Sequence, residues 1–249
     1  MSLAVSGFII AMAFLTAALS GVFGMAGGLL LKGALALVLP VSATFVAHGI
    51  FQLVANGWRA ILHRKHVVWR IVAVYALGAF TAGALIGLVV YEPTKPTLYL
   101  LMGLVPGLVW LPQGWVKVDA SRPPQAFVCG LGVTGMNLTA GVAGPLLDVF
   151  FVRTALTRHA IVATKAATQV FSHLMKIVVY GAPLFATGGK GMPPAWVFAL
   201  AIPLSMLGTA AGGLVLNRLS DVDFKRYLRL ILTVIGAIYL AQAARLYMS

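Results

Sequence analysis

Long apolar stretches, separated by short polar or Pro/Gly-rich breaks, occupy most of this chain. They cover residues 3–20, 26–40, 41–62, 67–91, 97–111, 125–140, 144–151, 159–185, 195–216 and 225–247. Several reach the roughly 20 residues that a helix needs to cross the hydrocarbon core of a membrane. Water cannot satisfy backbone groups there, and the alternation of barrel strands is absent. The sequence therefore predicts an all-α polytopic membrane protein, with a single transmembrane domain over residues 1–249.

Two glycine-rich segments interrupt the apolar pattern, SGVFGMAGG at 20–28 and NLTAGVAGP at 137–145. When the sequence is aligned with itself at an offset of 117 residues, Gly24 pairs with Gly141 and Gly27 pairs with Gly144. The same offset pairs Gln52 with Gln169, which lie in two later apolar stretches. This agreement predicts an internal duplication, with repeats at 1–111 and 125–249 joined by a linker at 112–124. Five helical segments per repeat is an odd number, so the second copy is inverted in the membrane, as in many secondary transporters.

The paired glycines have two interpretations. Glycine allows a tight turn and exposes backbone N–H groups that can bind an anion. Alternatively, glycine provides the small-residue faces on which membrane helices pack. We expect the first two segments of each repeat to form a glycine-interrupted hairpin, which either spans the membrane or re-enters it. A further run of small residues at 78–87 packs either within the protomer or between the protomers of a homodimer.

Charge predicts the orientation of the chain. It has 18 Lys and Arg against 5 Asp and Glu, a net charge of +13, and 61% of its residues are hydrophobic. In a membrane protein this excess indicates the positive-inside rule and contact with anionic lipids, not nucleic acid. With paired hairpins, twelve basic residues fall in the odd-numbered connections and three in the even-numbered ones. The odd connections are therefore expected to be cytoplasmic, and both termini non-cytoplasmic.

Two apolar stretches carry matching polar stripes, with residues spaced by four, four and three positions. The stretch 41–62 bears His48, Gln52, Asn56 and Arg59, and the stretch 159–185 bears Lys165, Gln169, His173 and Lys176. Such stripes face each other, water or a substrate, because polar side chains are costly against lipid. At about 1.5 Å per residue, the two glutamines lie roughly 15–17 Å from their helix starts, near the midplane. The stripes are the strongest functional signal in the chain.

Each polar residue also has a structural interpretation. The glutamines can simply join the two helices, the histidines can be satisfied interfacial residues, and Arg59 can be a cytoplasmic anchor. Lys176 either contributes to the site or snorkels outward. Lys165 lies deeper with few acidic partners, so we expect it to bind the charge of the substrate. Asp148 pairs with Lys32 or Lys165, or it carries a coupling proton.

The segment GMAGG after an apolar N-terminal helix, the second glycine-rich copy and the chain length resemble the TauE/SafE sulfite exporter family. The resemblance implies export of sulfite or a small organosulfonate across the bacterial inner membrane, driven by an ion gradient and without a cofactor. In the second copy Pro145 stands opposite Gly28, a departure from the glycine pattern.

The excess of cations within the apolar stretches favours an anionic substrate, whose oxygens can accept hydrogen bonds from Lys, Gln, His and backbone N–H groups. We expect the site to comprise Gln52, Gln169, His48, His173, Lys165, Asn56, Gly24, Gly27, Gly141 and Gly144, with Asp148, Lys32 and Lys176 as coupling or ion-pair candidates. No metal site is expected. The chain contains no HExxH, no GxSxG and no paired carboxylates, so it is not expected to be an enzyme. An anion channel, an uptake carrier and a non-transporting scaffold remain alternatives.

Overall fold

A computed structural model describes residues 1–23, 26–89, 92–110, 118–151, 154–216 and 221–248 of the chain. Within these ranges the chain is helical and has no strand, which confirms the predicted all-α class. The α-helices are α1 (Leu3–Phe23), α2 (Ala26–Val38), α3 (Val41–Leu62), α4 (Trp69–Val89), α5 (Lys95–Leu104), α6 (Pro123–Thr139), α7 (Gly144–Phe151), α8 (Arg158–Ala186), α9 (Ala195–Leu216) and α10 (Asp221–Met248). Two short 3₁₀ helices, η1 (Arg64–His66) and η2 (Val105–Trp110), follow α3 and α5.

Threonine and proline mark the starts of several helices. The side chains of Thr94 and Thr157 cap α5 and α8 by accepting hydrogen bonds from backbone N–H groups three residues later. Helix α6 begins on Pro123, because the first turn of a helix does not need the N–H group that proline lacks. The predicted stretch 97–111 is only partly α-helical. Pro106 cannot donate an i−4 hydrogen bond, and the chain continues there as η2.

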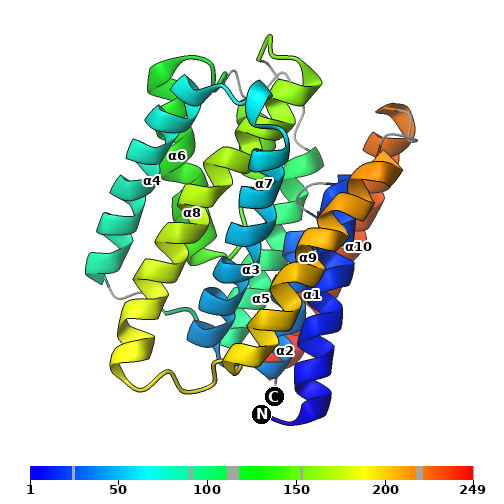
Figure 1. Cartoon of the computed structure of the whole chain (residues 1–249). Helices are drawn as coiled ribbons and strands as arrows, with labels where there is room; N and C mark the ends of the chain where they lie inside the picture. The colour runs from blue at the N-terminus through cyan, green and yellow to red at the C-terminus, as the bar shows by residue number, and fades with distance from the viewer. Residues whose placement is uncertain (24–25, 90–91, 111–117, 152–153, 217–220, 249) are drawn as a thin grey trace.

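The helices form a continuous series of packed pairs in the order α6, α4, α8, α3, α9 and α1. Helices α3 and α8 pack on each other near the middle of the molecule (Figure 1). Helices α5 and α10 form a further pair, α2 contacts α1 and α3, and the short α7 contacts α6 and η2. The two helices with the predicted polar stripes are therefore neighbours in the interior.

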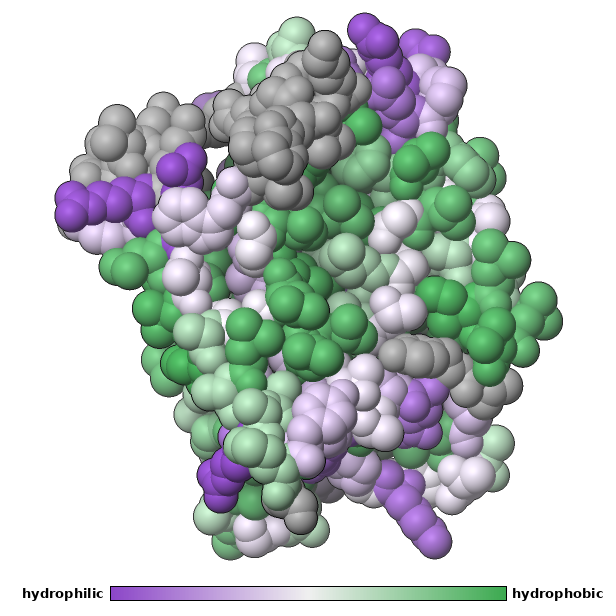
Figure 2. Space-filling model, turned by 180° about the vertical axis from the view of Figure 1, so that it is seen from behind, coloured by the Kyte–Doolittle hydropathy of each residue, from purple (hydrophilic) through white to green (hydrophobic). Residues whose placement is uncertain are grey.

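The outer surface is that of a membrane protein. Among the residues that the structure describes, four helices are long and apolar enough to cross a membrane, spanning Leu3–Phe23, Trp69–Val89, Ala195–Val215 and Arg226–Met248. Large apolar side chains point outward from them, such as Leu88, 81% exposed, and Leu214, 70% exposed. Apolar side chains dominate the middle of the molecule in Figure 2, and polar ones gather toward both ends. A surface of this kind suits lipid and not water.

Small residues bring helices α4 and α6 close together within the protomer. On α4, the small residues Gly78, Ala79, Ala82 and Gly83 are buried in the single chain, whereas Ala84 and Gly87 are exposed. Gly78 faces α6, where a Cβ atom would collide with the carbonyl oxygen of Phe127. Four of the six small residues therefore pack inside the protomer.

Replacing Gly130 of α6 with alanine tests this close contact. A Cβ there would collide with the carbonyl oxygen of Tyr75 and lie 3.1 Å from the backbone nitrogen of Ala79, both on α4. Since α4 must then move, Gly130→Ala is expected to lower the free energy of unfolding by about 1–3 kcal/mol. Gly135→Ala is a matched control on the same helix, because no described atom lies within 4 Å of its Cβ position. Equal thermal midpoints for the two purified variants would contradict the packing.

Candidate functional site

A cavity of about 110 Å³ lies between the two stripe-bearing helices, α3 and α8. Its walls are completed by the start of α2, the end of α6, and the beginning of α7. The lining residues are Gly28, Leu29, His48, Gln52, Asn56, Arg59, Asn137, Val142, Ala143, Gly144, Leu147, Val162, Lys165, Ala166, Gln169 and His173. The cavity therefore lies where both glycine-rich interruptions meet the polar stripes, and the positive ends of α2 and α7 start at its wall.

The polar stripes face each other across the cavity. His48, Gln52 and Asn56 come from α3, whereas Lys165, Gln169 and His173 come from α8. The ring centroids of His48 and His173 lie 5.7 Å apart, in an edge-on arrangement. On α3, the amide nitrogen of Asn56 donates to the carbonyl oxygen of Gln52 at 2.9 Å, within the same helix. The structure thus brings together six of the predicted side chains from two distant parts of the sequence.

The predicted glycines have different positions. Gly144 lines the cavity, whereas Gly24 lies outside the described residues. Gly27 instead faces α1, where a Cβ would collide with the carbonyl oxygen of Thr16. Gly141 has a φ of 80°, a conformation that favours glycine, and it forms the turn between α6 and α7.

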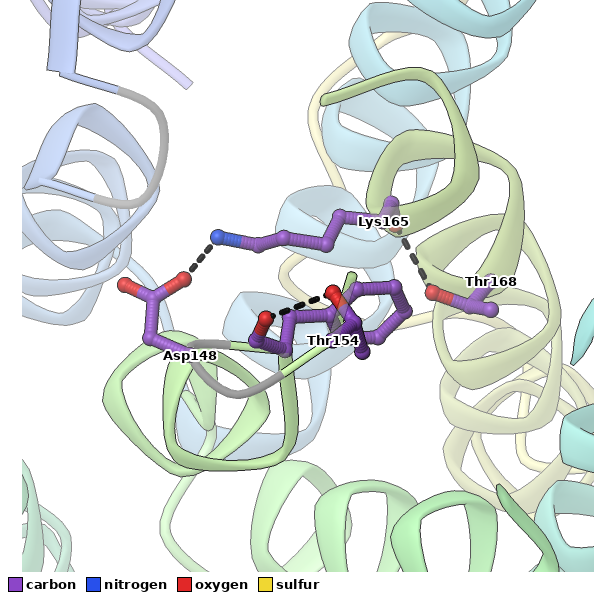
Figure 3. Close-up of polar contacts among 5 residues, drawn as sticks. Asp148, Thr154, Lys165 and Thr168 are labelled. Atoms are coloured by element: carbon purple, nitrogen blue, oxygen red, sulfur yellow. Dashed lines mark hydrogen bonds and ion pairs between the residues drawn. The ribbon is translucent and has the colours of Figure 1, made fainter. Parts of the chain in front are cut away.

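Lys165 reaches from α8 across to Asp148 of α7, and the two form an ion pair (Figure 3). The hydroxyl of Thr168 donates to the carbonyl oxygen of Lys165 one turn away, at 2.8 Å. The Lys165 and Asp148 side chains are 23% and 38% exposed, so the pair is partly solvated. Asp148 was expected to pair with Lys32 or Lys165 or to carry a coupling proton, and the structure shows the pair with Lys165. The lysine therefore presents its charge to the cavity beside a carboxylate.

Lys176 and His48 connect the two glycine-rich interruptions. His48 Nε2 lies 2.9 Å from the carbonyl oxygen of Gly28, which can only accept, so Nε2 carries the proton. The unprotonated Nδ1 then accepts from Lys176 Nζ at 3.1 Å. Lys176 Nζ also donates to the carbonyl oxygen of Gly141 at 2.7 Å. Lys176 is fully buried and does not snorkel outward.

Lys32 is also fully buried, outside the cavity wall. Its Nζ lies 3.1 Å from the centroid of the Phe45 ring, a cation–π contact. No hydrogen-bond partner for this Nζ is found among the described residues. Lys32 also lies close to Gly141, whose absent side chain leaves room for the end of the lysine side chain.

Two polar residues of the described lining, Arg59 and Asn137, were not predicted as site residues. Arg59 was interpreted as a cytoplasmic anchor, yet it lines the cavity, and its guanidinium donates to the carbonyl oxygen of Ser20 at 2.9 Å. The sequence signal for Arg59 was its position in the polar stripe of the stretch 41–62, whose residues are spaced by four, four and three positions. Asn137 lies near the end of α6. The only sequence signal for it was its position at the start of the second glycine-rich segment.

Several buried polar atoms at the cavity have no hydrogen-bond partner in the described part of the chain. They are both amide atoms of Asn137, Nε2 of Gln169 and Nδ1 of His173. Buried polar groups in native proteins are nearly always paired, so each unpaired one needs an explanation. Three such side chains in the wall of a single cavity indicate a site that is completed by a polar ligand or by water.

The fold and the cavity define a polytopic membrane protein with a polar interior site, an arrangement found in transporters and channels. The family model of the sulfite exporter TauE/SafE matches residues 9–239 of the 249. The chain belongs to this family of membrane transporters, which confirms the resemblance based on its glycine-rich segments. Comparisons with curated proteins and with solved structures found no match.

Proposed function

We propose that this protein is a secondary transporter that exports a small sulfur oxyanion, sulfite or an organosulfonate, and binds it in the cavity between α3 and α8. The observation that carries the proposal is the chemistry of the cavity wall. It contains Arg59 and Lys165 together with amide and imidazole groups, whereas the carboxylate of Asp148, which is paired with Lys165, is not among the described lining residues. Charge-assisted hydrogen bonds from such groups suit a compact oxyanion better than a cation or a sugar.

An inverted repeat is part of this proposal, and the packing of the helices supports it. If α1–α5 correspond to α6–α10, the α1–α9 contact corresponds to α6–α4, and α3–α9 to α8–α4. The α3–α8 and α5–α10 contacts each correspond to themselves. A two-fold axis in the membrane plane would relate Gln52 to Gln169 and pass between α3 and α8, where the cavity lies.

Two cations add support for the repeat. Arg59 and Lys176, which are 117 residues apart, each donate to a backbone carbonyl at or just beyond the end of the first helix in a repeat. Arg59 binds the carbonyl of Ser20 near the end of α1, and Lys176 binds that of Gly141 just after α6. Cations are favourable at the negative ends of helices. A similar contact therefore recurs near the end of the first helix in both halves, with the two carbonyls one helical turn apart in the 117-residue alignment.

We further propose that the α6–α7 hairpin is re-entrant. Helix α7 has 8 residues, a length of about 12 Å, which is too short to cross the membrane. The backbone N–H of Ala120, just before α6, donates to the carbonyl oxygen of Phe150 at 2.9 Å. The end of α7 thus lies beside the start of α6. Such a hairpin keeps its irregular backbone next to the cavity and away from lipid.

The proposed transport step is an alternating exposure of the cavity to the two sides of the membrane. Movement of one half against the other would open it in turn, as in other transporters with inverted repeats. The Lys165–Asp148 pair and the Lys176–His48 contact lie between elements of the cavity wall. They are the candidate places at which an ion gradient is coupled to the movement.

Flux measurements test this function. Purified protein in lipid vesicles is expected to move radiolabelled sulfite in a saturable manner, and an imposed proton gradient is expected to change the rate. Unlabelled sulfite on the opposite side should accelerate exchange, a result expected of a carrier and not of a channel. Flux no greater than that of protein-free vesicles would reject the proposal.

The proposed orientation places both termini outside the cytoplasm. In Figure 1 the termini lie together at one end, whereas the α3–α4 connection and the start of α10 lie at the opposite end. These opposite segments are rich in basic residues, including Arg64, Lys65, Arg226 and Arg229. A reporter that is active only in the cytoplasm, fused after Ser249, is therefore expected to be silent. A strong signal from this fusion would show that the C-terminus is cytoplasmic and that the proposed orientation is wrong.

A further inference from the structure

Asn137 is the most unusual polar residue of the cavity. It lies near the end of α6, one turn before the Gly141 turn, and its side chain is 1% exposed. Neither its amide nitrogen nor its amide oxygen has a hydrogen-bond partner within the described chain, although Asn137 lines the cavity. A neutral amide buried without partners is costly, so the ligand is the natural partner for both atoms.

The chemistry of the amide group restricts that ligand. Because both atoms are unpaired, either orientation of the amide presents a donor group, the NH₂, and an acceptor, the carbonyl oxygen. The donor suits an oxyanion, as does a donor on Gln169 or His173. The acceptor does not, because an oxygen of an anion offers it only lone pairs. An anion without a hydrogen to donate would leave the amide oxygen of Asn137 unpaired.

We propose that the cavity recognises a monoanionic sulfur oxyanion that carries its own N–H or O–H donor, and that Asn137 is the residue that selects for this donor. This inference rests on the proposed function and names the chemical class of its substrate. Two ligands fit the class: a singly protonated inorganic oxyanion, and a sulfonate bearing a hydroxyl or amino group. A cavity of about 110 Å³ favours the more compact one.

Two probes of the same charge and similar size isolate the role of the donor. Sulfamate carries an amino group where methanesulfonate carries a methyl group, and both are monoanions at neutral pH. Wild-type protein is expected to bind sulfamate about 10-fold more tightly than methanesulfonate, because methanesulfonate leaves a buried acceptor unpaired. Calorimetry on the full-length protein in detergent measures both affinities without any substitution.

The variant Asn137→Leu is expected to remove this preference. Its sulfamate affinity should fall about 10-fold, whereas its methanesulfonate affinity should stay the same or rise. Gln242→Leu on α10 is the matched control, because Gln242 does not line the cavity, and it should keep the wild-type preference. A smaller Asn137→Ala variant provides the same comparison if the leucine variant does not fold.

The outcomes separate this inference from the function on which it rests. If wild-type protein binds both probes equally, or if Asn137→Leu keeps the preference, the proposed role of Asn137 is wrong. The proposal that the cavity binds an anion is then unaffected. If wild-type protein binds neither probe nor sulfite, the proposed function itself fails. A third probe, 2-hydroxyethanesulfonate, carries its donor on a longer arm. Binding as tight as that of sulfamate would identify an organosulfonate as the ligand, and exclusion would identify the inorganic oxyanion.

Discussion

Replacing Lys165 with methionine is expected to weaken binding of sulfite by about 10- to 150-fold. A charge-assisted hydrogen bond to an oxyanion contributes about 1.5–3 kcal/mol, and methionine keeps the apolar length of the side chain without the charge. The ion pair adds a second effect, since the variant leaves the Asp148 carboxylate without its partner, close to the bound anion. Lys165→Arg keeps the charge on a wider planar group, and it should restore binding only in part.

A double-mutant cycle separates these two effects. Asp148→Asn alone frees the charge of Lys165, so it should strengthen anion binding or leave it unchanged. The double variant Lys165→Met/Asp148→Asn should bind sulfite more tightly than Lys165→Met, by about 5- to 10-fold, because the unpaired carboxylate is gone. Binding isotherms for all four proteins, with thermal stability measured in parallel, complete the cycle. Normal sulfite binding by a well-folded Lys165→Met protein would show that this lysine is structural.

The second large effect is expected at the turn between α6 and α7. Gly141 has a φ of 80°, which costs a residue with a Cβ about 1–2 kcal/mol. The Cβ of an alanine would also lie 2.6 Å from Cε and 3.2 Å from Nζ of the buried Lys32. Crowding in a packed core typically costs a further 1–3 kcal/mol. Gly141→Ala is therefore expected to lower the free energy of unfolding by about 2–5 kcal/mol.

A second glycine separates strain from crowding. Gly188, between α8 and α9, has a similar φ of 87°, but no described atom lies within 4 Å of its Cβ position. Gly188→Ala should show only the conformational cost of about 1–2 kcal/mol. Chemical unfolding of both variants in the same detergent measures the difference. If Gly141→Ala is no less stable than Gly188→Ala, the contact with Lys32 does not constrain the turn.

The periodicity of the sequence was sufficient to predict the helical class and much of the cavity wall. Gln52 and Gln169 could be matched because the two stripes share one spacing, and a polar stripe in an apolar helix has to turn away from lipid. The same reasoning predicts that α3 and α8 are neighbours, as they are in the structure. Such predictions are simpler for a membrane protein, because polar side chains are excluded from the face of each helix that contacts lipid.

The tertiary structure decided which side chains contact each other. From the sequence, Asp148 had three alternatives, and only the approach of α7 to α8 selected the pair with Lys165. Arg59 was expected at the cytoplasmic surface, because spacing along one helix does not show that α1 ends beside it. Asn137 carried no periodic signal, and it stands out only because its buried amide has no hydrogen-bond partner among the described residues.

By itself, the sequence determined the elements that follow from local rules: apolar length for helices, glycine for interruptions, and regular spacing for polar faces. The structure decided how the start of α2, the end of α6 and the start of α7 meet α3 and α8 at the cavity, because those contacts join residues far apart in the chain. The carbonyl groups of Gly28 and Gly141 that bind His48 and Lys176 are an example. Every residue has such a carbonyl, so no sequence pattern distinguishes the two that these side chains reach.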